Sequence, residues 1–252
     1  KMLITLVTVT FNAEKTLERT LRSVESQNFS DMEHIIMDGA STDSTVAMAE
    51  SYKRRNPERS ITIVSERDKG LYDAMNKAIN MARGKFVCFL NAGDKLHAAD
   101  TLDKIASATS LHPDAGVIYG DTDIVDDNGT KLRSRRLSPP EHLNWKSFRN
   151  GMLVCHQAFY ANRSIIPPYD NQSYRFSADF DWCIRIMKKA ATKSMPLINS
   201  HEILADYLSE GMTTANHKAS LRERFNIMKK HYGLFTTLLQ HAWFVVRALL
   251  KK

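Results

Sequence analysis

The segment KFVCFLNAGDKL, residues 85–96, decides the fold. Residues 86–90 are all apolar, which is typical of a strand that is buried on both faces of a parallel sheet. The run stops at NAGD (91–94), where two small residues accompany an amide and a carboxylate. Ligands bind to open parallel sheets beyond the carboxyl ends of the strands, so the segment predicts that Asp94 lies at a binding edge.

The same arrangement recurs along the first half of the chain, where apolar runs alternate with helical patterns. The expected strands are 3–11, 33–39, 60–66, 85–94 and 115–121, and the expected helices are 13–27, 41–55, 71–82 and 98–112. This β-α-β order predicts an α/β fold with a mainly parallel, Rossmann-like sheet flanked by helices. A hairpin that turns at 127–129, a loop-rich stretch at 138–175 and three more helices, which begin near 177, 216 and 234, are expected to follow.

We therefore expect one α/β domain over 1–215 and a C-terminal helical extension over 216–252. Within the domain, a nucleotide-binding half covers about 1–120 and an acceptor half about 121–215. The 252 residues suffice for one large domain with an appendage.

Composition and motifs narrow the functional classes. The net charge is +7, and the basic residues form local groups at 53–55, at 133–136 and in the last third without a dense block, so we expect no nucleic-acid partner. Three widely spaced cysteines make neither a disulfide framework nor a zinc site and indicate a reducing compartment. No G-x-G-x-x-G follows the first strand and no P-loop is present, which argues against dinucleotide and P-loop sites.

Carboxylates and amides, often beside Gly or Ala, follow each of the first four strands. Local capping explains any one of them, but four converging ends indicate a ligand site. Carboxylates can bind a nucleobase or ribose, or hold the divalent cation that neutralises a pyrophosphate.

Four segments together resemble the successive motifs of glycosyltransferase family 2, which has the GT-A fold. They are VTVTFNAEKTLERTLRSVESQ, IIMDGASTDST, SERDKGLYDAMNKAINMARGKFVCFLNAGD and SADFDW, and the resemblance covers about residues 3–210. It is strongest to bacterial enzymes of capsule, exopolysaccharide and O-antigen assembly. It implies inverting transfer of a sugar, most often UDP-linked, from a nucleotide diphosphate to a hydroxyl of a glycan or of a lipid-linked glycan.

The resemblance also assigns donor-site residues. The base, ribose and sugar contacts fall on Thr10, Asn12, Asp38, Asp68, Gly70, Asp73, Asn76 and Asn91. Asp94 takes the position that ligates Mg²⁺ or Mn²⁺. Asn91 replaces the usual leading Asp of that motif and is a poorer metal ligand, although it can still bind ribose.

The catalytic base is expected in SADFDW (177–182), where Ala178-Asp179 replaces the common Glu-Asp of the family. Inversion needs one carboxylate that takes the proton of the acceptor hydroxyl as the new bond forms. The resemblance points to Asp179 first and Asp181 next. An Asp in the first turn of a helix is also an ordinary charge preference.

Four further residues have weaker indications. Asp121 and Asp123 form a literal D-x-D after an apolar run, which suits the acceptor side, the start of the hairpin or a metal. His156 and Gln157 lie between apolar groups, where a histidine is usually a satisfied core residue. Their place before Asp179 suggests a donor-sugar or acceptor pocket.

The segment 234–252 combines an apolar helical stripe with a Trp and a terminal Lys-Lys. A helix in a membrane interface, a helix packed on the domain and a homodimer contact all fit this pattern. No run of 18 uncharged apolar residues is present, so we expect a cytoplasmic protein, either free or peripheral on the inner face of the membrane.

Two other functions remain open. A nucleotidyltransferase also uses acidic metal ligands on an α/β sheet, but its Gly-rich, basic phosphate loop is missing near the N-terminus. A catalytically silent, nucleotide-sugar-binding scaffold would agree with the departures at Asn91 and Ala178.

Overall fold

The computed structural model describes residues 2–209 and 217–249. The strands are β1 Ile4–Thr10, β2 Met32–Asp38, β3 Ser60–Ser65, β4 Phe86–Phe89, β5 Lys95–Leu96, β6 Val117–Val125, β7 Lys131–Ser134, β8 Phe159–Asn162 and β9 Leu197–Leu208. The α-helices are α1 Leu17–Glu25, α2 Thr45–Arg55, α3 Leu71–Met81, α4 Thr101–Leu111, α5 Ala178–Thr192, α7 His217–Tyr232 and α8 Leu234–Leu249. Three 3-10 turns are η1 Ser147–Asn150, η2 His156–Ala158 and η3 Arg163–Ile165.

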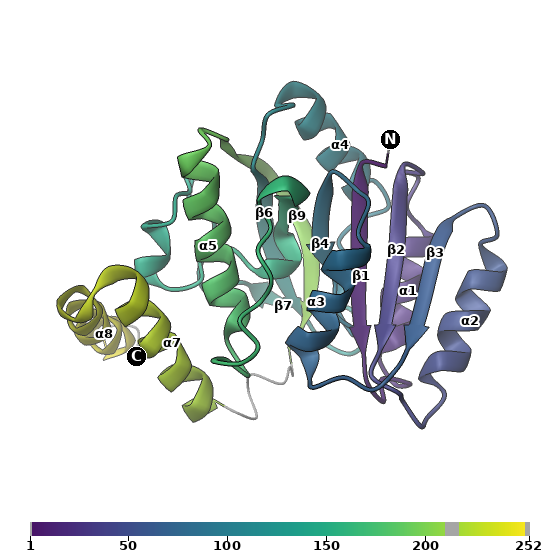
Figure 1. The fold of residues 1–252 in the computed structure, drawn as a ribbon, viewed down its shortest axis with the longest axis horizontal. Coiled ribbons are helices and arrows are strands. Elements are labelled where there is room, and N and C mark those ends of the chain that lie inside the picture. Colours follow the sequence, from purple (N-terminus) through teal and green to yellow (C-terminus); the bar gives the residue numbers. More distant parts are fainter. Residues whose placement is uncertain (1, 210–216, 250–252) are drawn as a thin grey trace.

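The described strands form one sheet with the order β3-β2-β1-β4-β8-β6-β9-β5, and β7 pairs with β6. β1 runs parallel to β2 and β4, and β2 runs parallel to β3. β8 is antiparallel to both β4 and β6, so β6 is parallel to β4. The carboxyl ends of β1 to β4 therefore share one edge, at the bottom of Figure 1. The expected mainly parallel sheet is confirmed, and so are the two C-terminal helices.

Helices cover both faces of this sheet (Figure 1). All seven residues of β1 are buried, which explains why its sequence is apolar with only threonines between. One core cluster joins the sheet to α3 and α5, and a second joins it to α1 and α4. The sheet edge is thus a rigid platform for the polar residues that follow the strands.

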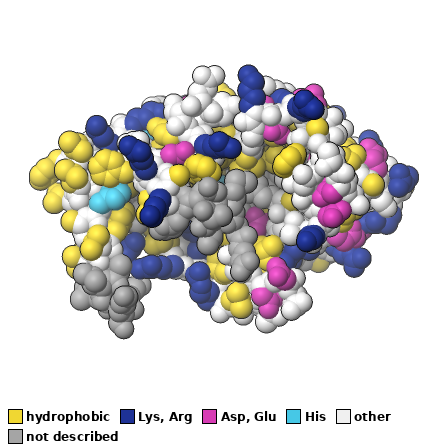
Figure 2. All heavy atoms as spheres, turned by 90° about the horizontal axis from the view of Figure 1, so that it is seen from below, with side chains coloured by type: hydrophobic (Ala, Val, Ile, Leu, Met, Phe, Trp, Pro, Cys, Tyr) yellow, Lys and Arg dark blue, Asp and Glu magenta, His cyan; other side chains and the backbone are white. Residues whose placement is uncertain are grey.

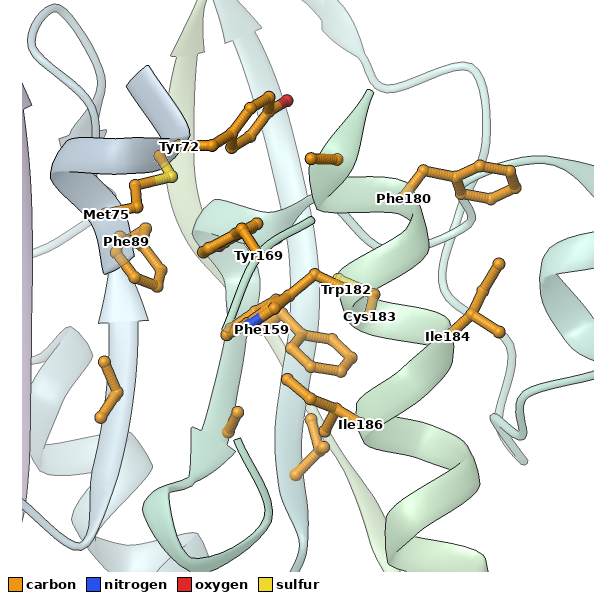
Figure 3. Close-up of a cluster of buried hydrophobic side chains, with 14 of the residues drawn as sticks. Tyr72, Met75, Phe89, Phe159, Tyr169, Phe180, Trp182, Cys183, Ile184 and Ile186 are labelled. Atoms are coloured by element: carbon orange, nitrogen blue, oxygen red, sulfur yellow. The ribbon is translucent and has the colours of Figure 1, made fainter. Parts of the chain in front are cut away.

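An aromatic stack beneath the start of α5 fixes that helix on the sheet (Figure 3). The Trp182 ring stacks on Tyr169 with centroids 4.7 Å apart and meets Phe89 edge-on at 5.6 Å. Its indole N–H donates to the carbonyl of Pro167 at 2.9 Å. The Tyr72 ring of α3 also stacks on Tyr169, with the ring centroids 5.3 Å apart. The first turn of α5 therefore has a defined position beside α3.

Three strands were missing from the sequence-based prediction. β5 is only two residues long and follows the turn at 91–94 directly. β8 lies inside the stretch that we expected to be loop-rich, and it is only four residues long. β9 is long, but polar residues interrupt its apolar pattern, His201 has a positive φ of 58°, and its pairing with β6 shifts register. The expected hairpin is confirmed, because Gly129 N–H donates to Asp126 O between β6 and β7.

Candidate functional site

The turn after β4 is held tightly against α1. Asp94 N–H donates to Asn91 O at 3.0 Å, and Gly93 has a φ of 104°, which favours glycine. Thr20 Oγ1 of α1 accepts from Gly93 N–H at 2.9 Å and donates to Asp94 O at 2.6 Å. Thr20 Oγ1 also lies 3.4 Å from Asn91 O, so one threonine contacts both ends of the turn and the side chains of Asn91 and Asp94 have defined directions.

The Asp94 carboxylate is nearly enclosed, with 5% of the residue exposed. Oδ2 accepts from Gln157 Nε2 at 2.6 Å, and Oδ1 accepts from the backbone N–H of Leu208 at 3.0 Å. Burial raises the pKa of Asp94 to about 6, against the lowering effect of these two hydrogen bonds. A cation at this carboxylate would offset the cost of burying its charge.

His156 connects the same turn to the start of α5. Its Nε2 lies 3.3 Å from Asn91 Nδ2, and its Nδ1 lies 3.3 Å from Asp179 Oδ2. If the Asn91 amide donates to Nε2, the proton of a neutral His156 is on Nδ1 and faces Asp179. Oδ1 of Asn91 is buried, and no described residue gives it a hydrogen bond.

Asp179 lies in the first turn of α5 with 16% of its side chain exposed. The hydroxyl of Tyr72 donates to its Oδ1 at 3.3 Å. Burial opposes ionisation of Asp179, but the hydrogen bond with His156 and the charge of Arg224 hold its pKa below the ordinary value. Asp179 is therefore an ionised carboxylate at neutral pH, oriented by two side chains.

Asp181 faces the other way, toward α7. Its side chain is fully buried and contacts Arg185 Nε at 2.5 Å, His231 Nε2 at 2.8 Å and Lys230 Nζ at 3.3 Å. Burial is opposed by the hydrogen bond from His231 and the charge of Arg185, and the pKa of Asp181 falls to about 2. These contacts join α5 to α7 and leave no oxygen open to a substrate.

The ends of β1 and β2 form a rigid polar cradle. Asp38 is buried and accepts hydrogen bonds from Thr10 Oγ1 at 3.0 Å, Ser65 Oγ at 2.7 Å and Ser41 N at 2.9 Å. Burial raises its pKa, but these hydrogen bonds outweigh that effect and lower it. Asn12 Oδ1 accepts from the neighbouring Thr42 N–H at 3.0 Å. The cradle is thus organised without a ligand.

Phe11, which sequence reasoning did not select, projects from this cradle with 66% of its surface exposed. An atom built as a side chain on Gly39 would lie 3.3 Å from the Phe11 ring and 2.7 Å from Asp68 Oδ2. The absence of a side chain at Gly39 therefore lets the Asp68 carboxylate and the Phe11 ring approach the backbone closely at this point. The sequence marks Phe11 only as an apolar residue that follows the end of β1 and precedes Asn12.

The residues after β3 differ in their roles. Asp68 Oδ1 accepts from Gly70 N–H at 2.8 Å, and Asp73 Oδ2 accepts from Lys69 N–H at 3.1 Å. Asn76 bonds both the N–H and the carbonyl of Tyr169, at 2.7 and 3.0 Å. Asp68 and Asp73 shape the loop at the strand end, whereas the Asn76 amide is fully engaged in holding the segment around Tyr169.

A second polar cluster contains Asp123. Among the described residues, ligand atoms of His97, Asp123 and Asp206 lie within 4.8 Å of one another and could hold a metal ion. Lys131 Nζ already pairs with Asp123 at 2.9 Å, and Lys95 Nζ pairs with Asp206 at 3.1 Å. These two ammonium groups neutralise the carboxylates and disfavour a cation there. Among the residues that the structure describes, the Asp121 side chain bonds its own neighbour, since its Oδ1 accepts from Thr122 N–H at 2.8 Å.

The turn after β4 and the start of α5 therefore form one hydrogen-bonded unit. Asn91, Asp94, His156, Gln157 and Asp179 converge from β4, η2 and α5, and Tyr72 joins them from α3. Figure 2 looks onto the carboxyl edge of the sheet from below.

A sequence model described as Glycosyl transferase family 2 matches residues 5–166. A protein of Mycobacterium tuberculosis (strain ATCC 25177 / H37Ra) named PGL/p-HBAD biosynthesis glycosyltransferase is 34% identical over 201 residues, which cover 79% of this chain and 73% of that protein.

Solved structures show the same fold. Staphylococcus aureus TarS, residues 1–349, superposes with a TM-score of 0.70 at 17% sequence identity. The match covers 96% of this chain and 72% of the TarS chain. TarS has also been solved in complex with UDP-GlcNAc. The mannosyltransferase PcManGT of Pyrobaculum calidifontis, solved with GDP-Man and Mn²⁺, has a TM-score of 0.60 at 16% sequence identity. This match covers 98% of this chain and 78% of the PcManGT chain.

Proposed function

Because this chain belongs to glycosyltransferase family 2 and is a transferase with the GT-A fold, we propose that it moves one sugar, with inversion, from a UDP-linked donor to a glycan hydroxyl. The acceptor is a glycan or lipid-linked glycan of cell-surface polysaccharide synthesis. The observation that carries this proposal is the Asp179 carboxylate, which is ionised, partly exposed and oriented by His156 and Tyr72.

Asp179 acts as the base. The acceptor oxygen attacks the anomeric carbon on the face opposite the leaving group, the bond to the nucleotide diphosphate breaks, and the acceptor proton passes to an oxygen of Asp179. The Nδ1–H of His156 fixes one carboxylate oxygen and the Tyr72 hydroxyl fixes the other. A base held in this way needs no reorganisation when the proton arrives.

The cradle at β1 and β2 receives the nucleotide. Phe11 is exposed and offers an aromatic ring on which a nucleobase stacks. Asp38 keeps the cradle rigid through its hydrogen bonds, and the Asp68 carboxylate approaches the backbone at Gly39 beside Phe11. Their arrangement agrees with the assignment of Thr10, Asn12, Asp38 and Asp68 to the donor nucleotide.

Asp94, with the open Oδ1 of Asn91, fits a hard divalent cation such as Mg²⁺ or Mn²⁺. When bound, the ion would neutralise the diphosphate of the leaving group. Gln157 and the backbone of Leu208 fix the orientation of Asp94, as is usual for carboxylates that ligate metals. We prefer Asp94 to the cluster around Asp123 because two lysines already neutralise that cluster.

Calorimetry with UDP-, GDP-, dTDP- and CMP-sugars, with and without Mn²⁺, measures which donor the protein binds. Release of the nucleotide from the bound donor measures sugar transfer. We expect Mn²⁺-dependent binding of a UDP-sugar that Asp94→Ala abolishes. Asp179→Asn should bind the donor within about two-fold of wild type but lose about 10²–10⁴-fold in turnover, as is typical for removal of a general base. Donor binding without turnover by wild-type protein would instead favour the catalytically silent scaffold, and no donor binding by folded protein would refute the proposed function. Full turnover by Asp179→Asn would refute the assignment of the base.

A further inference from the structure

Helix α8 presents its apolar side to solvent. Within the part whose side chains are described (234–247), every exposed residue is apolar: Leu234, Phe235, Leu238, Leu239, Ala242, Trp243, Val245 and Val246. The residues with restricted exposure are polar, apart from one phenylalanine: Thr236, Thr237, Gln240, His241, Phe244 and Arg247. A helix on the surface of a water-soluble domain normally has the opposite arrangement.

Specific contacts hold α8 in this orientation. Thr237 is fully buried and donates to Gly233 O at 2.7 Å. The His241 ring meets Phe225 of α7 edge-on with centroids 5.0 Å apart, and Phe244 packs against the core cluster that contains α5. Rotating the helix to bury its apolar side would expose these contacts, so the outward apolar face belongs to the fold.

The charge of the protein is concentrated in the same segment. Residues 217–252 contain eight of the 35 Lys and Arg residues but one of the 28 Asp and Glu residues. The segment therefore has a net charge of +7, which equals the net charge of the whole chain, and residues 1–216 are neutral overall. In Figure 2, hydrophobic side chains gather at the end of the molecule that α8 forms, with Lys and Arg near them.

We propose that the exposed face of α8 binds in the interfacial region of an anionic lipid bilayer. An apolar face that carries Trp243 and Phe235, flanked by basic residues, has the chemistry of an interfacial helix. A second copy of the chain is a poorer occupant, because it would bring another charge of +7 to the same place.

The helix would lie in the plane of the membrane. Its 16 residues extend about 24 Å, which is less than the roughly 30 Å of the hydrocarbon core. Within the residues that the structure describes, no helix meets the length and hydropathy needed to cross a bilayer. An active site on the same rigid body would then lie near the membrane surface.

Co-sedimentation with vesicles tests this proposal without any need for turnover. Vesicles of phosphatidylcholine alone would be compared with vesicles that also contain roughly 30% phosphatidylglycerol, which gives an anionic surface. Both would be used at about 0.1 M and about 0.5 M salt, between which the Debye length falls from about 10 Å to about 4 Å. We expect binding to the anionic vesicles that weakens at high salt. Leu239→Gln with Trp243→Gln should abolish it, and Arg222→Gln with Lys229→Gln should weaken it about five-fold for each charge removed.

The matched control is Leu111→Gln with Leu132→Gln, which makes the same chemical change at exposed leucines outside 217–252 and should bind like wild type. Trp243 also reports directly, since its emission should shift to shorter wavelength with anionic vesicles, and Trp243→Phe should remove that shift. This readout holds even if the double glutamine variant misfolds. Wild-type protein that ignores anionic vesicles, or that forms a dimer which the Leu239 and Trp243 changes dissociate, overturns the proposal.

Discussion

Replacing Asp94 with Asn should stabilise the metal-free protein at neutral pH while it removes donor binding. The carboxyl has a pKa of about 6 in the folded protein against its usual 3.8, because burial disfavours the charged form. The difference of about 2 units corresponds to up to about 3 kcal/mol of unfolding free energy. Asparagine is isosteric and uncharged, so it can keep one hydrogen bond to Leu208 N–H without this cost.

The raised pKa of Asp94 determines how the stability of the wild type changes with pH. A raised pKa means that the folded state holds the proton more tightly than the unfolded state, so the wild type loses stability as the pH rises from about 4 to about 6. The variant has no such titration. The gain of Asp94→Asn should therefore be near zero at pH 4 and largest above pH 6.

Urea denaturation of both proteins between pH 4 and 8 in EDTA measures this difference. Asp38→Asn is the matched control, since four hydrogen-bond donors lower the pKa of Asp38, and its substitution should destabilise the protein more at pH 7 than at pH 4. Adding Mn²⁺ should stabilise the wild type and leave Asp94→Asn unchanged. A variant that is less stable than wild type at pH 7, or a difference that is the same at pH 4 and pH 7, would refute the reasoning.

Three further substitutions test other parts of the site. Phe11→Ala should weaken donor binding by about 1 kcal/mol through loss of stacking, at unchanged stability; equal affinities measured by calorimetry would contradict this. Trp182→Ala should destabilise the protein by about 3–5 kcal/mol, because it empties the aromatic stack under α5, and urea denaturation measures it. Asp181→Asn should cost about 3–5 kcal/mol by leaving the buried Arg185 and His231 contacts uncompensated, so a variant of wild-type stability that lost turnover would argue for catalysis by Asp181 instead.

The sequence could predict those parts of the site that depend on local order. A strand end delivers its next residues to the sheet edge regardless of tertiary detail, so Asp38 and the turn at 91–94 could be placed from their patterns alone. The parallel order of the first four strands follows from the same alternation.

The positions of the other site residues depend on strand and helix pairing between distant parts of the chain. His156 and Gln157 reach Asp179 and Asp94 because β8 inserts antiparallel between β4 and β6, and a four-residue strand gives too weak a periodic signal to predict that pairing. Asp179 and Asp181 are two residues apart, hence about 200° apart around the helix. The docking of α7 against Asp181, and the contacts of His156 and Tyr72 with Asp179, distinguish the two residues.

The sequence also could not predict which side of α8 faces the solvent. The helical stripe was visible in the sequence, and so was its polar opposite side. Which side faces the protein depends on the contacts that His241 and Phe244 make, and no periodicity contains that information.

The stereochemistry of the first-formed product tests the central claim most directly. The donor that binds in calorimetry, a UDP-α-sugar, would be incubated with the protein and Mn²⁺, with water as the acceptor, and followed by proton NMR from the first minutes. Inverting transfer with Asp179 as the base predicts that the β-anomer of the released sugar appears first and that Asp179→Asn releases it at least about 10²-fold more slowly. An α-anomer formed first, or equal release by Asp179→Asn, would contradict the account.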